Sequence, residues 1–246
     1  MMKKYPIILL FPVLLQQSGC DDPDAFNCLK KSGTVIEEEV VLEEVEKVFV
    51  YDGVQLDLVY GDTQQVIIRG GENLIPNVNF QVNEKLLTIT DDNSCDWVRD
   101  YEPIVVTITS NRLKEIRSGG YGLIKSLNTL SFENLWVESK DGSGDFELTV
   151  AVERLWVVNN SFSNITISGT ANFLSLGHWY NDGRFIGSNL EVSHAAVAQN
   201  GVNDIFIHVK EKLSGQLTSR GNIFYFGNPE IIEVDISGTG QLINKQ

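Results

Sequence analysis

Basic residues and long apolar runs are both scarce in this chain of 246 residues. Lys and Arg number 19 against 33 Asp and Glu, which gives a net charge of −14. A protein with such an excess of negative charge repels phosphate backbones, so we expect no nucleic-acid partner. The N-terminal apolar run, Ile7 to Leu15, is nine residues long, whereas a helix needs about 20 residues to cross a bilayer. The sequence therefore predicts no membrane-spanning helix.

The motifs of common catalytic and metal-binding sites are also missing. No HxxxH, HExxH, GxSxG or GK[ST] spacing occurs, and the three cysteines include no CxxC pair. The three histidines, His178, His194 and His208, stand in different sequence contexts. We therefore predict no cofactor and no metal site.

The first 19 residues have the organisation of an export signal. Lys3 and Lys4 precede the apolar run, which is too short to span a membrane. The run ends in "QSGC", which resembles a bacterial lipoprotein signal whose cysteine, here Cys20, becomes the acylated N-terminus. A plain secretory signal with an incidental cysteine is the alternative. We expect residues 1–19 to be a signal peptide and residues 20–34 to be a tether.

The residues after Cys20 predict the location of the protein. The stretch "DDPDAFNC" is acidic and resembles the surface-export signals of Bacteroidetes lipoproteins. We therefore expect a lipoprotein of the outer membrane that faces outward from the cell envelope. Its N-terminal lipid would be its only contact with the membrane.

Two cysteines remain if Cys20 is acylated. Cys28 and Cys95 would then be a pair in an oxidising compartment. A disulfide across that span would stabilise the fold by roughly 4 kcal/mol in the loop-entropy model. Two free, buried thiols are the alternative.

The second half of the chain repeats. The third position after each glycine- or asparagine-rich turn is large and apolar, at intervals of 22, 19, 20, 20, 18 and 19 residues. These positions are Ile124, Phe146, Ile165, Phe185, Ile205, Ile223 and Leu242. A second motif, leucine or isoleucine followed at i+2 by an apolar residue, precedes the turns at residues 135, 155, 174, 190 and 232.

Each repeat contains two short segments in which apolar residues alternate with polar ones, as in strands. A coil of parallel strands with one turn per repeat fits this period, and its apolar residues would stack in columns. We therefore predict an all-β protein: a right-handed parallel β-helix-like solenoid of about seven rungs, each of about 20 residues, over residues 111–246. Residues 35–110 lack this period and predict an N-terminal β layer that leads into the coil, with strands at Val48–Tyr51, Gln55–Tyr60, Val66–Gly70 and Leu86–Asp91. The stretch "VIEEEVVLEEVEKV" fits either a strand or a short helix.

The turns include "DGSGD" at residues 141–145, which could also be taken for a calcium loop. An EF-hand would need glycine at Phe146 and glutamate at Val152, so the calcium interpretation fails. We interpret these turns as structural, with glycine recurring because sharp corners need positive φ.

The stretches "GSGD", "NIFYFGNPEI" and "DISGTGQLI" resemble the glycine-rich repeats of the family of the putative auto-transporter adhesin, head GIN domain. The stretches "VFVYDGVQLDLVYGD" and "CDWVRDYEPIVVTITSNRLKEI" resemble its opening strands, so that the resemblance covers residues 35–246. It implies an all-β body with β-helical character on a cell-surface lipoprotein, and adhesion is implied by the name alone.

Catalysis on such a scaffold would require paired acids or a calcium cluster. Asp145 and Asp204 stand three rungs apart, about 14 Å at the usual strand spacing, whereas a glycosidase pair lies about 5 to 9.5 Å apart. We therefore predict that the protein is not an enzyme. A polysaccharide lyase or hydrolase of the pectinase-like β-helix type is a distant alternative.

A binding surface is the function that the pattern favours. In each "LWV" motif the Leu and Val should point inward, which places Trp136 and Trp156 outward on adjacent rungs. Exposed aromatic rings bind sugars and proteins alike. The alternative is that the N-terminal strands cover both indoles. The other candidate contacts are Glu138 and Glu191 as acceptors beside the indoles, and His178, Trp179 and Tyr180 on a turn.

Two functions are compatible with the sequence. The first is an adhesion or binding module for a glycan or a surface protein. The second is a structural or assembly protein of the envelope.

Overall fold

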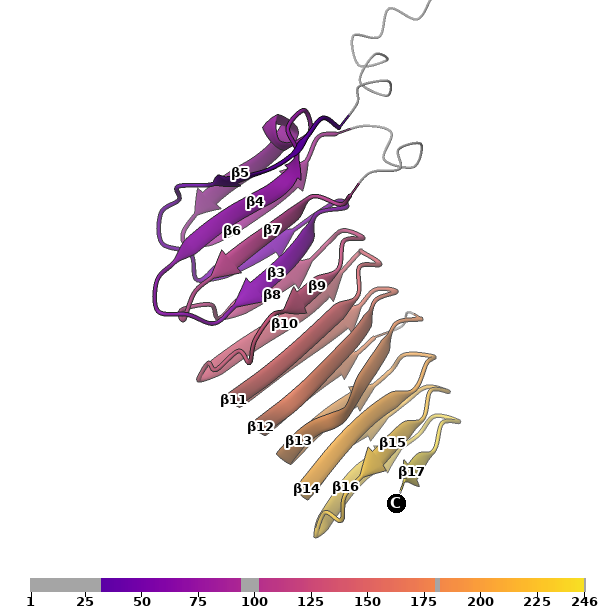
Figure 1. Cartoon of the computed structure of the whole chain (residues 1–246). Helices are drawn as coiled ribbons and strands as arrows, with labels where there is room; N and C mark the ends of the chain where they lie inside the picture. The colour runs from indigo at the N-terminus through magenta and orange to yellow at the C-terminus, as the bar shows by residue number, and fades with distance from the viewer. Residues whose placement is uncertain (1–31, 94–101, 180–181, 246) are drawn as a thin grey trace, which may run out of the picture.

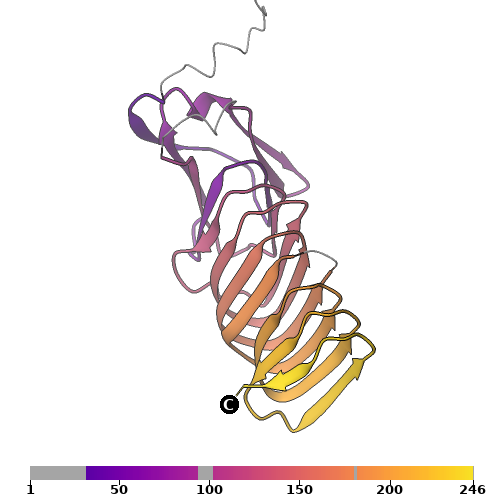
Figure 2. The same cartoon turned by 90° about the vertical axis from the view of Figure 1, so that its right-hand side faces the viewer.

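The computed structural model describes residues 32–93, 102–179 and 182–245. Its strands run across the long axis of the molecule and stack from the N-terminal end to the C-terminal end (Figures 1 and 2). The strands of the repeat region are β8 (Glu115–Ser118), β9 (Ile124–Ser126), β10 (Asn134–Lys140), β11 (Phe146–Asn160), β12 (Asn164–His178), β13 (Arg184–Gln199), β14 (Ile205–Leu217), β15 (Ile223–Phe226), β16 (Ile231–Ile236) and β17 (Leu242–Asn244).

The predicted column of large apolar residues is confirmed. Each of the seven pairs in parallel register with the next, in the order Ile124, Phe146, Ile165, Phe185, Ile205, Ile223 and Leu242. All but Leu242 in the last rung are 0% exposed. Because burying one such side chain stabilises a fold by about 1.5–3 kcal/mol, this column holds the rungs together. The solenoid has about six turns, slightly fewer than the seven rungs expected.

The second apolar column differs from the prediction at one rung. Leu135, Leu155 and Leu174 stack as expected, but Leu174 then pairs with Ala195. The column continues through Leu213 to Ile232. Placing Leu190 in it was wrong: Leu190 pairs with Gly169 in the preceding segment. Leu190 stands five residues before Ala195, so it belongs to the neighbouring column of Val150 and Gly169. A shift of register between Thr166 and Gly169 also gives β13 one extra residue.

Parallel stacking begins earlier in the chain than the 20-residue period indicated. Strands β2 (Lys47–Val50) and β3 (Gln55–Val59) pair in parallel with β8 and β9 on one side. On their other side they pair in parallel with β6 (Leu86–Asp91) and β7 (Val105–Thr109). The rung formed by β2 and β3 therefore lies between two rungs that follow it in sequence.

Antiparallel strands close the N-terminal end of this stack. β4 (Gln65–Gly71) pairs with β7 and with β1 (Val35–Glu39), and β5 (Val78–Asn83) pairs with β6. A short 3₁₀ helix, η2 (Ile75–Asn77), follows β4. Side chains from this region, Val66, Ile68 and Leu74, are at most 2% exposed and join the core.

The four strands predicted in this region are confirmed to within one residue at each end. The acidic stretch "VIEEE" is strand β1 rather than a helix.

The glycine-rich turns owe their composition to close stacking, so the explanation by positive φ was wrong for them. The described glycines with positive φ are Gly33, Gly169, Gly215 and Gly227, and the positive φ within "DGSGD" belongs to Asp141. A Cβ on Gly142 or Gly144 would instead clash with the backbone of the turn one rung away, at Gly120 or Gly122. Successive turns therefore contact each other backbone to backbone, and only glycine fits between them.

We expect Gly144→Ala to lower the free energy of unfolding by about 1–3 kcal/mol, because the new methyl group meets the Gly122 carbonyl oxygen. Urea denaturation followed by circular dichroism measures the change. Ser143→Ala, at an exposed position in the same turn, is the control and should stay within about 0.5 kcal/mol of the parent. Equal stability of the two variants would contradict close stacking of the turns.

Candidate functional site

Trp136 and Trp156 lie side by side on the outer surface of the solenoid. They occupy paired positions of β10 and β11. Their strand neighbours, such as Leu135 and Val157, are buried at 0–1% exposure, which turns both indoles outward. Both indoles are half-buried, and both line the same hollow, so the N-terminal strands do not seal them off.

The column that contains the two tryptophans changes abruptly to small side chains. Trp156 pairs with Ser175, which is followed by Ala196 and then Ser214. The surface therefore steps down from two indoles to a floor of hydroxyl and methyl groups. Two adjoining hollows of about 460 and 490 Å³ lie over this floor, and both are lined by Trp156, Ser175 and Ala196. We call them together the groove.

A third tryptophan completes one wall of the groove. Trp179 lines the same hollow as Trp136 and Trp156. Its indole lies over Gly177, where a Cβ would come within 2.8 Å of the indole nitrogen. The missing side chain at Gly177 therefore leaves the space that Trp179 fills, and three indoles from three consecutive rungs gather at one end of the groove.

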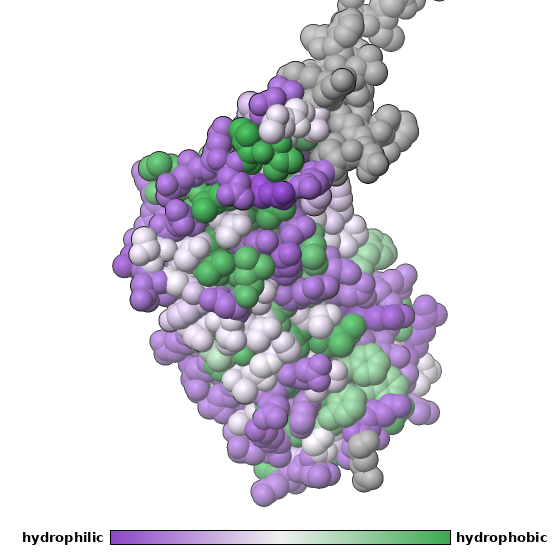
Figure 3. All heavy atoms as spheres, viewed as in Figure 1, coloured by the Kyte–Doolittle hydropathy of each residue, from purple (hydrophilic) through white to green (hydrophobic). Residues whose placement is uncertain are grey.

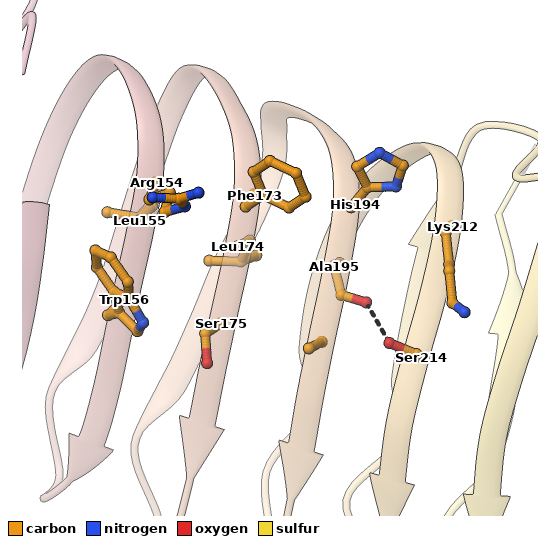
Figure 4. A pocket seen from close by; sticks show the side chains of 11 residues that line it. Arg154, Leu155, Trp156, Phe173, Leu174, Ser175, His194, Ala195, Lys212 and Ser214 are labelled. Carbon is orange, nitrogen blue, oxygen red and sulfur yellow. Dashed lines mark hydrogen bonds between the residues drawn. The ribbon is translucent and has the colours of Figure 1, made fainter. Parts of the chain in front are cut away.

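The opposite wall is a row of side chains at successive corners of the coil, which Figure 4 shows on neighbouring strands. Arg154 pairs with Phe173, Phe173 with His194, and His194 with Lys212. Each residue directly precedes an inward residue of the second apolar column. At these corners two adjacent residues face outward; for example, Glu153 and Arg154 are both exposed. We call these four residues the basic row.

Contacts within the basic row hold its members in place. The Arg154 guanidinium carbon lies 5.8 Å from the centroid of the Phe173 ring, within cation–π range. The Phe173 and His194 rings stack with centroids 5.0 Å apart. The Lys212 ammonium lies 2.7 Å from a Glu233 carboxylate oxygen, and His194 lies 3.6 Å from Glu211. The row is therefore an ordered strip of aromatic and basic groups.

The two predicted acceptors do not serve the tryptophans. Glu138 lies two residues beyond Trp136, but its carboxylate pairs with Arg117 at 3.1 Å. Glu191 lies in another column, paired in the sheet with Thr170, and its carboxylate contacts Lys210. Lys210 lowers the pKa of Glu191 by hydrogen bonding to its carboxylate. Neither Glu138 nor Glu191 lines the groove.

His178 is fully buried and belongs to the interior. Its ring nitrogens lie 2.8 Å from the Gln199 side-chain oxygen and 2.8 Å from the Gly183 carbonyl oxygen. Burial lowers its pKa, although these two hydrogen bonds oppose the shift. His178 stacks in a polar column with Ser139, Asn159 and Gln199, and this column hydrogen-bonds the neighbouring turns. It cannot touch a surface ligand.

Four predicted residues lie outside the described part of the chain. They are Tyr180, Cys20, Cys28 and Cys95. The acylation and the disulfide stay predictions.

The family is established by the match between this chain and a family model. Residues 44–229 match the model of the putative auto-transporter adhesin, head GIN domain. The chain belongs to this family. The matched range includes the three tryptophans and the whole basic row. The resemblance seen in the repeats is thereby confirmed.

Solved structures share the fold of this family member. A putative adhesin from Bacteroides fragilis is 24% identical with a TM-score of 0.79, over 86% of this chain and 97% of that one. A putative adhesin from Parabacteroides distasonis is 18% identical with a TM-score of 0.64, over 87% and 98%. A putative lipid binding protein from the same species is 16% identical with a TM-score of 0.64, over 87% and 98%. The chain matches no protein of curated function.

Asp145 and Asp204 bind the backbone of the next rung in this adhesin-family chain. Asp145 accepts hydrogen bonds from the Asn164 backbone at 2.8 Å and from its side chain at 3.2 Å. Asp204 likewise accepts from the Asn222 backbone at 2.9 Å. Both acids therefore fix the spacing of adjacent turns.

Two negative findings apply to residues 32–93, 102–179 and 182–245. No cluster of three or more His, Cys, Asp or Glu in these ranges could hold a metal ion. No helix in them is long and apolar enough to cross a membrane.

Sequence reasoning missed the basic row, although the sequence contains a signal for it. Arg154, Phe173, His194 and Lys212 each stand one position before an apolar column residue. The repeat that locates the column also locates the residue in front of it. Asp145 and Asp204 were predicted from the position before the first column, and Trp136 and Trp156 from the position within "LWV". The position before the second column was not used.

Proposed function

We propose that this protein is a non-catalytic adhesion or binding module of the cell envelope that holds a glycan or protein ligand in the groove. The observation that carries the proposal is the gathering of Trp136, Trp156 and Trp179 beside a floor of small residues. Rigid aromatic rings give a large contact area at low conformational cost, and a step between large and small side chains leaves room for a ligand. A volume of about 460–490 Å³ in each hollow fits a small-molecule site.

Membership of an adhesin family supports a cell-surface binding role. The relatives from Bacteroides fragilis and Parabacteroides distasonis described as putative adhesins are in line with it. The relative described as a putative lipid binding protein raises a lipid as another ligand. The filled interior of this chain favours a ligand on the surface, because the column residues from Ile124 to Ile223 are 0% exposed and leave no room for an acyl chain.

The binding of Asp145 and Asp204 to adjacent turns supports a non-catalytic role, because both carboxylates already have backbone partners. We therefore favour binding over the pectinase-like lyase or hydrolase.

A structural or assembly role is the second candidate. Ile231, Ile232 and Ile236 in β16 are 44–47% exposed on the last described rung. β16 pairs in the sheet with β14, and β17 pairs with β15. Exposed apolar side chains on an edge strand are typical of surfaces that join another chain. Self-association that survives loss of the tryptophans would favour this candidate.

We further propose that the protein is an outer-membrane lipoprotein, anchored through Cys20 and facing outward, with Cys28 and Cys95 bridged. The basic, apolar and small-residue segments before Cys20 support export and acylation. An excess of 33 acidic over 19 basic residues argues against nucleic acid as a partner.

We expect the double variant Trp136→Ala, Trp156→Ala to lose at least tenfold in affinity for its best ligand on a glycan array while it stays folded. The indoles are on the surface, so their loss removes contact area from the groove more than from the core. The matched control is Phe206→Ala with Phe224→Ala, a stacked aromatic pair with centroids 5.0 Å apart on other strand segments. Loss of binding in the phenylalanine variant and its retention in the tryptophan variant would move the site to that other surface.

We expect Cys20→Ser to release the protein from the membrane fraction of an expressing bacterium and to abolish incorporation of a labelled fatty acid. Cys28→Ser is the control and should stay attached, because it keeps the acylated residue. Continued fatty-acid labelling of Cys20→Ser would contradict the lipoprotein proposal.

A further inference from the structure

We propose that the groove selects an acidic saccharide, with the sugar ring against Trp156 and its carboxylate or sulfate group at the basic row. This inference rests on the proposed binding function and names the class of ligand.

The basic row stands out against the charge of the whole molecule. The chain carries a net charge of −14, yet Arg154, His194 and Lys212 gather along one wall of one groove. Two of them have acidic neighbours, Glu211 beside His194 and Glu233 beside Lys212. Arg154 takes part in none of the ion pairs found among the described residues. It is therefore the cation that is available to a ligand.

Arg154 is well placed for an anionic group on a bound ring. It stands two residues before Trp156 on β11, and positions i and i+2 of a strand face the same side about 6–7 Å apart. The Phe173 ring supports its guanidinium group at 5.8 Å. A planar guanidinium binds a carboxylate or sulfate through two parallel N–H···O bonds. Figure 4 shows Arg154, Trp156 and Phe173 around one end of the hollow.

The floor of the groove suits hydroxyl-bearing rings. Ser175 is exposed in it, and Ser214 donates a hydrogen bond to the Ala195 carbonyl oxygen at 3.2 Å, as Figure 4 shows. Hydroxyls both donate and accept, as sugar hydroxyls do. Ala196 keeps the floor low enough for a ring to approach the indole edge.

The sheet under the groove disfavours an acidic peptide as the occupant. β11, β12 and β13 are paired on both sides, and β14 pairs with β13 and β16 along the groove. A peptide could therefore not add a strand there, which is the usual way in which a sheet binds an extended chain. A phospholipid is also disfavoured, because the core beneath the groove is filled. Hydrophilic residues cover much of the surface seen in Figure 3, with smaller hydrophobic patches between them.

The experiment measures the affinity of the full-length protein for matched pairs of short saccharides by isothermal titration calorimetry. One pair is trigalacturonic acid and its fully methyl-esterified form; the other is sulfated N-acetyllactosamine and unsulfated N-acetyllactosamine, so that one member of each pair is neutral. Short ligands are used because the net negative charge of the protein repels long polyanions, and 150 mM salt limits that repulsion to about 8 Å. We expect the acidic member of at least one pair to bind at least tenfold more tightly than its neutral counterpart.

Arg154→Gln should lower the affinity for the acidic member about tenfold and leave the affinity for the neutral member unchanged. Arg184→Gln, an exposed arginine at the start of β13, removes the same charge outside the groove and should change neither affinity. Thermal melting of both variants checks that they fold.

The outcomes separate this inference from the proposed function. Equal affinity for acidic and neutral members, with loss of both in Trp156→Ala, would overturn the inference and leave a groove that binds neutral glycans. No binding of any of the four saccharides would overturn it as well, and unchanged glycan-array binding in the tryptophan double variant would then overturn the proposed function too. Binding to phosphatidylglycerol vesicles but to no saccharide would replace the sugar with a lipid.

Discussion

Parallel stacking in register is the constraint on which the rest of this structure depends. Because each rung lies directly over its neighbour, a residue type that recurs once per turn becomes a continuous column. Columns that point inward build the core, as the file from Ile124 to Leu242 does. Columns that point outward place the same type of side chain on every rung of one surface. A residue type that recurs once per turn therefore forms a stripe along the axis of the molecule.

The same constraint shapes the groove. One outward column changes from tryptophan to serine and alanine between β11 and β13, and this change in size is what hollows the surface. The neighbouring column carries the basic row at the corners of the coil, where two consecutive residues face outward. The groove thus needs no dedicated loop or insertion. It arises from which residues occupy two adjacent columns of β10 to β14, with Trp179 beyond the end of β12 adding to one wall.

The core was predictable because its signal is redundant. A large apolar residue recurs seven times at nearly constant spacing, so an error at one rung would not hide the period. The second column shows where this reasoning ends. Ala195 is too small to stand out in the sequence, whereas Leu190, which belongs to the neighbouring column of Val150 and Gly169, matches the motif. The positions of the glycine-rich turns were predicted correctly, but the reason for glycine was wrong. Contact between turns depends on residues one rung away, and the φ preference of a single residue does not reveal it.

The outward direction of Trp136 and Trp156 followed from strand alternation alone. Trp179 lies beside them because Gly177 has no side chain and leaves space for its indole, which the sequence does not reveal. His178 is buried because it belongs to a polar inward column with Asn159 and Gln199 near the turn.

One face of each strand that lines the groove is sealed in the coil, while the other lies on the surface. Hydroxyl-radical footprinting with mass spectrometry tests it on the unaltered protein, because phenylalanines on the two sides are chemically identical. Phe146 and Phe185 are 0% exposed, whereas Phe173 in the basic row is 39% exposed. The account predicts rapid oxidation of Phe173 and strong protection of Phe146 and Phe185. Oxidation of all three at similar rates would contradict it.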